Sequence, residues 1–160
     1  MILSTIETFG MNTAIESFKI YKQSMRQENL AEAALAGADL AEELVKEDMR
    51  ENKTGRAFPH LPRVSSRDGE TPAIQSLELH DSLFTEKLTS IAPHIGRAKL
   101  ETDHDHGLWM EYGFTTRDGA FHSRPFMRPI VDQNRADIQS RMQEVMRMSQ
   151  VKAGAFVKGR

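Results

Sequence analysis

The sequence contains no cysteine. This absence excludes disulfide frameworks, thiolate metal sites and cysteine nucleophiles. Long apolar runs are also missing: no stretch approaches the roughly 20 apolar residues that cross a bilayer. The first ten residues lack the basic start and apolar stretch of a secretory signal peptide. We therefore expect no membrane association and maturation in a reducing cytoplasm.

Net charge is small as well, at −2 over 160 residues. Proteins that bind nucleic acid non-specifically are usually clearly basic, so this total argues against that class. The total nevertheless hides two opposed regions. Residues 28–51 carry eight acids and two bases, whereas residues 117–160 carry nine bases and four acids. This asymmetry favours contacts between neighbouring subunits, in which the acidic region of one meets the basic region of another.

The chain is also lean in apolar residues, which make up 39%, and its mean hydropathy is −0.52. Its length suits one domain, but the predicted core is small, and a small core favours an assembly that supplies further buried surface. We predict a single domain over residues 1–150, followed by a flexible basic C-terminal tail at 151–160.

Residues 12–50 show a helical pattern, because apolar side chains recur three and four residues apart and helix-favouring alanine and glutamate dominate. We predict one long N-terminal helix, or two helices that meet in a bend near residues 27–29. Gly37 among alanines indicates close packing against another element. A C-terminal helix is predicted from Pro129 to about Met148, with the proline tolerated in its first turn.

Between these helices the sequence favours a loop and then strands. Prolines, serines and glycines over residues 53–75 are typical of a long loop that is functional or mobile. Strands are predicted near residues 77–84 and 89–100. Leu108-Trp109-Met110-Glu111-Tyr112 is the most strand-like segment, since it is rich in aromatics and bounded by glycines. The fold class is therefore α+β: a long N-terminal helix, a small antiparallel β-sheet and a C-terminal helix packed on the sheet.

Few patterns point to catalysis or cofactors. Asp103-His104-Asp105-His106 has metal-ligand chemistry, but a solvated turn is the favoured interpretation, because consecutive ligands in one turn seldom complete a site. No Gly-x-Ser-x-Gly nucleophile motif and no phosphate-binding loop occurs. We expect no catalytic residues, no metal and no cofactor.

Two other segments carry a resemblance. Met110-Glu111-Tyr112-Gly113 is followed, after a short insertion, by Ser123-Arg124-Pro125-Phe126-Met127-Arg128-Pro129. This pattern resembles the signature V/M-E-Y/F-G-T … A-R-P-F-L-R-P-A of the neck, or tail-completion, proteins of long-tailed bacteriophages. Ser65-Ser66-Arg67-Asp68-Gly69-Glu70-Thr71-Pro72-Ala73, followed by Leu79-His80-Asp81-Ser82-Leu83, is similar to a second motif of that family, A-S-A-P-G-E-P-P-A … T-G-x-L-R-x-S-I. Phe114 stands where the signature has threonine, and Leu77-Glu78 where it has threonine-glycine. The resemblance covers roughly residues 14–148.

The resemblance implies a virion structural protein of the head–tail junction, not an enzyme. Such proteins form a homo-oligomeric ring, expected to be a hexamer, which completes or attaches the tail. The implied partners are the head-connector and the tail-terminator or tail-tube proteins, with genomic DNA passing through the channel without specific binding. The implied location is the virion, assembled in the host cytoplasm. The signature residues expected at a subunit interface or in closing the fold are Glu111, Tyr112, Gly113, Arg124, Pro125, Phe126, Arg128 and Pro129. For Arg124 and Arg128 we predict inter-subunit or fold-closing ion pairs.

Three alternatives remain open. The chain could be a tail-terminator ring protein that caps the tail tube. It could be a small metal-dependent enzyme that uses His104, Asp105 and His106. It could also be a nucleic-acid-binding module whose arginines meet phosphates. Those arginines are Arg124, Arg128, Arg135, Arg141 and Arg147.

Overall fold

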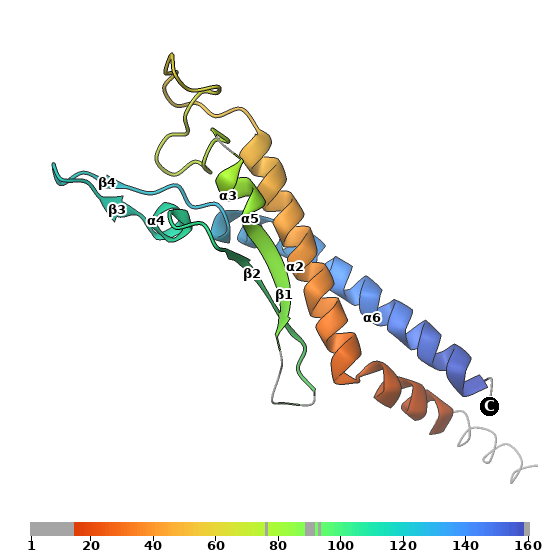
Figure 1. Cartoon of the computed structure of the whole chain (residues 1–160). Coiled ribbons are helices and arrows are strands. Elements are labelled where there is room, and N and C mark those ends of the chain that lie inside the picture. The colour runs from red at the N-terminus through yellow and green to blue at the C-terminus, as the bar shows by residue number, and fades with distance from the viewer. Residues whose placement is uncertain (1–14, 76, 89–91, 93, 159–160) are drawn as a thin grey trace, which may run out of the picture.

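Two long helices run side by side through the molecule (Figure 1). The computed structural model describes residues 15–75, 77–88, 92 and 94–158. Helix α2 (Gln27–Arg50) and helix α6 (Arg135–Lys158) are antiparallel neighbours from opposite ends of the chain. They approach closely because α2 carries Gly37, where a Cβ would lie only 2.7 Å from Met142 Cγ. The close packing predicted for Gly37 is thus confirmed.

The N-terminal helical region consists of two segments, which is one of the two forms that the sequence predicts. Residues 15–24 are helical, the chain turns at Met25 and Arg26, and α2 begins at Gln27. The Asn29 side chain bridges this break by donating hydrogen bonds to the carbonyl oxygens of Gln23 and Ser24, both at 3.1 Å. These carbonyls end a helix and would otherwise lack partners.

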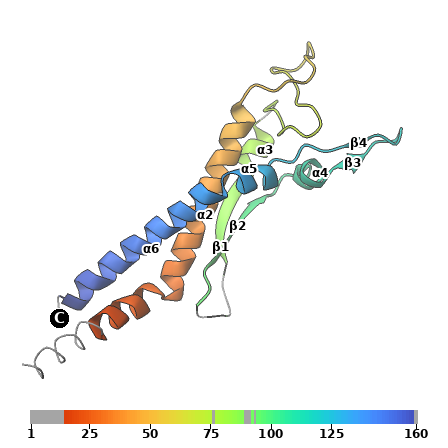
Figure 2. The same cartoon turned by 180° about the vertical axis from the view of Figure 1, so that it is seen from behind.

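The sheet has two strands, β1 (Leu83–Leu88) and β2 (Arg97–Thr102), paired antiparallel with Leu83 opposite Thr102. One face of this hairpin packs on α2, and α6 packs on another side of α2 (Figure 2). The predicted α+β class is confirmed. Its middle layer is α2, however, so the C-terminal helix packs mainly on the N-terminal helix, not on the sheet.

The segment Leu108–Tyr112 is not a strand, contrary to its prediction, but lies in the short helix α4 (Gly107–Tyr112). Backbone bonds from Met110 N–H to His106 O and from Gly113 N–H to Trp109 O, 2.9 and 2.8 Å long, close its turns. The aromatic residues that favoured a strand lie on the solvent side of this helix. The predicted strand near 77–84 is also shorter at its start, since residues 78–81 form helix α3 (Glu78–Asp81).

A small hairpin follows α4. Strands β3 (Phe114–Thr115) and β4 (Phe121–His122) pair antiparallel, with Phe114 opposite His122. We call α4 and this hairpin, residues 107–124, the arm. Figure 1 shows it projecting from the molecule on the side of the sheet. The predicted loop at 53–75 is confirmed and projects from the end of α2, because no helix or strand occurs between α2 and α3 in the described residues.

The predicted C-terminal helix is two helices. Helix α5 (Arg128–Gln133) holds Pro129 in its first turn, as expected, and Asn134 separates it from α6. Helix α6 does not end near Met148 but continues to Lys158. The segment expected to be a flexible tail from residue 151 is therefore helical as far as Lys158.

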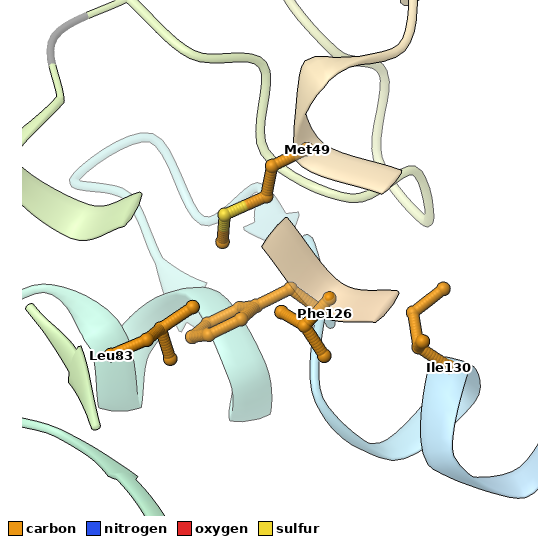
Figure 3. Packing of buried hydrophobic residues seen from close by; sticks show 5 residues of the cluster. Met49, Leu83, Phe126 and Ile130 are labelled. Atoms are coloured by element: carbon orange, nitrogen blue, oxygen red, sulfur yellow. The ribbon is translucent and has the colours of Figure 1, made fainter. Parts of the chain in front are cut away.

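The hydrophobic core is small, as its composition predicts. It lies where α2, β1 and α5 meet, and its fully or almost fully buried residues are Val45, Met49, Leu83, Phe126 and Ile130. Phe126 is 0% exposed and lies between Leu83 and Ile130 in Figure 3. In the described part of the chain, no helix is both long enough and apolar enough to cross a membrane.

Candidate functional site

Glu111 joins the two halves of the phage-like signature. Its carboxylate accepts three backbone hydrogen bonds, from the N–H groups of Phe126, Met127 and Arg128, at 2.8, 3.0 and 3.0 Å. These N–H groups precede and begin α5, where a helix leaves its first donors unsatisfied and favours negative charge. Glu111 therefore supplies from α4 the cap that α5 lacks in its own sequence. We call this contact the Glu111 cap.

Gly113 makes the turn that leads from α4 into the arm hairpin. Its φ is +89°, a backbone conformation that other residues rarely adopt. A Cβ at this position would also lie 2.2 Å from the Phe121 ring. The return strand is fixed nearby, because Arg124 N–H donates to Met110 O at 2.9 Å. The signature glycine thus lets the arm fold back beside α4.

Arg124 and Arg128 do not form the predicted ion pairs within the chain, as far as the described residues show. The Arg128 guanidinium lies over the Tyr112 ring, 5.5 Å from its centroid, a favourable cation–π geometry. Arg124 Nε is buried and has no hydrogen-bond partner. The fold is closed by the backbone bonds of Arg124 and Arg128 instead. Ion pairs to another subunit stay a prediction.

The remaining signature residues fix the start of α5. Phe126 fills the core. Pro125, half-buried, precedes it, and Pro129 occupies the first turn of α5. The structure therefore brings all eight signature residues into one region, between the arm and α5.

A groove of about 470 Å³ lies beside the Glu111 cap, between β2, α4 and α5. Its apolar wall is formed by Leu100, Leu108, Tyr112, Phe126, Met127 and Val131. Large apolar side chains also stand exposed on the arm: Leu108, Trp109, Tyr112 and Phe121 are all more than half exposed. Of these, Leu108 and Tyr112 line the groove, and exposed apolar groups beside a groove are typical of protein-binding surfaces.

The second phage-like motif contacts the root of the arm. Gly69 N–H donates to Ser123 O at 2.8 Å, and Asp68 Oδ2 lies 2.9 Å from His122 Nδ1. Two segments that are about fifty residues apart and carry the resemblance separately are therefore neighbours. Sequence reasoning placed both motifs but missed His122, for which the pattern offers no signal.

Glu70 holds the two ends of the 53–75 loop together. Its carboxylate accepts hydrogen bonds from the Thr54 hydroxyl, at 2.5 Å, and from Arg67 N–H, at 2.8 Å. These bonds favour the charged form, the Thr54 hydroxyl most strongly, and they lower the pKa of Glu70 from 4.5 to about 2. The loop is therefore tied near its base by a carboxylate whose ionised form these bonds favour.

This tie predicts an acid-sensitive loop. A carboxyl whose pKa is lowered on folding stabilises the fold above its unfolded pKa, near 4.5, and loses that contribution as pH falls through about 2. The Thr54 amide resonance in NMR spectra should titrate with a midpoint near pH 2, and the Glu70→Gln variant should lack that titration. The stability difference between wild type and Glu70→Gln should shrink from pH 4.5 to pH 2. A Thr54 midpoint at 4.5 would contradict the tie.

The Asp103–His106 segment forms a turn before α4. The rings of His104 and His106 lie 5.3 Å apart, and His104 Nε2 lies 3.9 Å from Glu78 Oε2. Among the residues that the structure describes, no group of three or more His, Cys, Asp or Glu side chains is placed to hold a metal ion. Asp103, Asp105 and His106 are exposed in this turn.

The site as a whole is a hydrogen-bonded joint between α4 and α5, with an apolar groove and an aromatic arm beside it. Comparisons with known proteins give no further guide, because no family model, no curated protein and no solved structure matches the chain.

Proposed function

We propose that this chain is a virion structural protein that forms a ring at the head–tail junction of a tailed phage and completes or attaches the tail there. The observation that carries the proposal is the Glu111 cap. It explains why a glutamate, a Tyr-Gly pair and an Arg-Pro-Phe-x-Arg-Pro sequence occur together, since each contributes to one joint between the arm and α5. The residues that carry the resemblance thus all contribute to the same contact between the arm and α5.

The shape of the molecule supports a role in an assembly. In the described part of the chain, one cluster of five buried apolar residues forms the core, and three parts of the molecule project from it: the arm, the 53–75 loop and the far end of the paired helices (Figure 1). Each projection exposes apolar side chains, for example Phe121, Val64 and Phe18. A monomer in water gains little from such projections, whereas a subunit uses them to reach neighbours.

The charge supports a channel that DNA traverses. A surface that grips DNA places many cations against the phosphates, and here the net charge is −2. Two cations of the C-terminal region are engaged within the chain, since Arg135 pairs with Asp132 and Arg141 pairs with Glu144. A wall of this kind allows DNA to slide past.

Electron cryo-microscopy of the particle that contains this chain tests the proposal. We expect a ring of this chain, six copies in number, between the head connector and the tail. Genes for portal, capsid and tail-tube proteins are expected beside its gene. A ring seated on the last tube layer would favour the tail terminator instead. Particles without the chain at the junction would overturn the proposal.

A further inference from the structure

The loop that follows α2 contains a stretch without an acidic side chain. Residues 52–67 carry four cations, Lys53, Arg56, Arg63 and Arg67, and neither aspartate nor glutamate. Lys53 is engaged, because its ammonium pairs with the Asp48 carboxylate at 3.3 Å. The three arginines are exposed, and among the described residues none of them forms an ion pair. We call these three arginines the cationic tip.

Hydrogen bonds hold the loop that carries the cationic tip. Gly55 N–H donates to Ser65 O at 2.9 Å, and Ser65 N–H donates to Arg56 O at 3.1 Å, so residues 55–65 form a closed lobe. Gly55 permits this approach, since a Cβ there would lie 2.3 Å from Ser65 O. From outside the lobe, the Gln75 side chain donates to Arg63 O at 3.1 Å. A loop fixed in this way loses less conformational entropy when it binds a partner.

One arginine of the tip lies against a ring. The Arg56 guanidinium is 5.3 Å from the centroid of the Phe58 ring, and the Phe58 and His60 rings are 5.7 Å apart. Stacking on a ring restricts a guanidinium but leaves its N–H donors available to an anion. These donors form a fork that matches the oxygen atoms of a phosphate.

The acids at the base of the loop are largely engaged elsewhere. Asp68 lies 2.9 Å from His122, and Glu70 accepts hydrogen bonds from Thr54 and from the backbone of Arg67. The charge of Arg67 also helps to lower the pKa of Glu70, so Arg67 is partly balanced. Arg56 and Arg63 therefore contribute most of the attraction for an anion.

The acids of α2 affect the tip less. Exposed Glu43 and Glu47 lie on the last turns of α2, where helical side chains lean toward the helix N-terminus and thus away from the loop. Glu51 is exposed at the end of the helix and forms no ion pair with any described residue. The balance at the projecting end of the loop (Figure 1) is therefore positive, although the whole chain is not.

The loop offers a protein partner little apolar surface. Within residues 53–75, all of which the structure describes, Val64 is the one large hydrophobic residue that is exposed, at 38%. Phe58 and Leu61 are half-buried. Protein interfaces centre on well-packed apolar and aromatic side chains, which the arm has and this loop lacks. Nucleic-acid interfaces depend on cations that meet phosphates, and that is the chemistry of the tip.

We propose that the cationic tip binds the phosphates of double-stranded DNA. Two or three phosphates are contacted per copy, without regard to base sequence, because phosphate contacts carry no sequence information. The inference rests on the proposed function for the identity of the polyanion, since DNA traverses the head–tail junction. A contact of so few charges is weak in one copy, and DNA exchanges it readily as it slides.

The salt dependence of DNA binding by the full chain tests the contact. Fluorescence anisotropy of a short labelled duplex should show binding at low salt. The logarithm of the affinity should fall against the logarithm of salt concentration with a slope of about −2 to −3, since each phosphate contributes about −0.9. Arg56→Gln or Arg63→Gln alone should reduce this slope by about one. The Arg56→Gln/Arg63→Gln/Arg67→Gln triple variant should bind about tenfold more weakly or worse.

A second triple variant is the matched control. Arg97→Gln/Arg117→Gln/Arg147→Gln removes the same charge from exposed positions on β2, between β3 and β4, and on α6. Its affinity for the duplex should fall less than about twofold, because distant charges are screened. Equal losses in the two triple variants would overturn the assignment to the tip. Circular dichroism checks that every variant is folded.

A fluorescent label locates the contact, because the chain has no native cysteine. A maleimide fluorophore on the His60→Cys variant should change its emission when the duplex is added. The same fluorophore on Thr115→Cys, an exposed position of the arm, should not change. A response at residue 115 without one at residue 60 would overturn the proposal.

The outcomes separate this proposal from the proposed function. A wild-type chain that does not bind the duplex at low salt would overturn the tip contact and leave the proposed ring standing. Tighter binding of a single strand would also overturn it, since bases stacked on Phe58 and His60 would then explain the affinity. Self-association that is lost in the tip triple variant, without DNA binding by wild type, would assign the tip to a neighbouring copy instead. DNA binding through the tip of a chain that is absent from the head–tail junction would overturn the proposed location and leave the tip contact intact.

Discussion

Replacing Glu111 with alanine is expected to lower the free energy of unfolding by about 3–5 kcal/mol, because three backbone N–H groups lose one shared, charged acceptor. The donors lie at the start of α5, where no helical carbonyl can replace the carboxylate. For a chain of this size the thermal midpoint should fall by about 10 °C. The loss should also loosen the arm, since the cap is the polar link between α4 and α5.

The control variants separate the cap from a general loss of charge. Glu111→Gln keeps one acceptor oxygen and should lose about half as much stability as the alanine variant. Glu101→Gln removes a carboxylate that lines the same groove but is exposed and, among the described residues, pairs with Lys99, so it should cost less than about 1 kcal/mol. Thermal unfolding followed by circular dichroism measures all three. A Glu111→Ala midpoint equal to that of wild type would refute the cap.

Replacing Phe126 with alanine is expected to cost about 3–5 kcal/mol, as for other fully buried aromatic residues. Phe126 is 0% exposed and is packed among Met49 of α2, Leu83 of β1 and Ile130 of α5. Because the core has so few residues, the cavity left by the missing ring would remove the contacts that hold α2, β1 and α5 together. This loss approaches the total stability of an ordinary domain, about 5–15 kcal/mol.

Urea unfolding measures the loss of unfolding free energy. A milder variant is needed as well, because Phe126→Ala gives no measurement if the chain does not fold. Phe126→Leu keeps an apolar side chain in the site and should cost about 1–2 kcal/mol. Leu77→Ala shortens an apolar side chain that is 58% exposed and should stay within about 0.5 kcal/mol. Equal losses for Phe126→Ala and Leu77→Ala would show that the core does not centre on Phe126.

The sequence predicts the helices well because their signal is local. Spacing of apolar residues, alanine content and Pro129 mark the helical regions. The same local rules fail at Leu108–Tyr112, where the aromatic residues favour a strand yet form α4. Their exposure shows the reason: Trp109 and Tyr112 are more than half exposed and do not pack on a sheet, so the strand propensity that reflects such packing has no effect here.

The site is predictable only in part. Resemblance identifies Glu111 and Arg128 as belonging together, but not that the carboxylate binds the backbone N–H of Arg128 while the guanidinium stacks on Tyr112. A charge pattern naturally predicts an ion pair between two such side chains. The actual contact depends on the orientation of α5 toward α4, a long-range feature set by Phe126 in the core. The contact between Asp68 and His122 also joins residues that are far apart in the sequence, so local patterns do not predict it.

The pairing of α2 with α6 has a consequence for the order of events during synthesis. Helix α2 lies near the start of the chain, and its partner begins only at Arg135. While the ribosome translates the residues between them, the face of α2 that will receive α6 stays open. The helix pair therefore closes only after most of the chain has been made. Any surface that is built from both helices therefore cannot form before α6 has been synthesised.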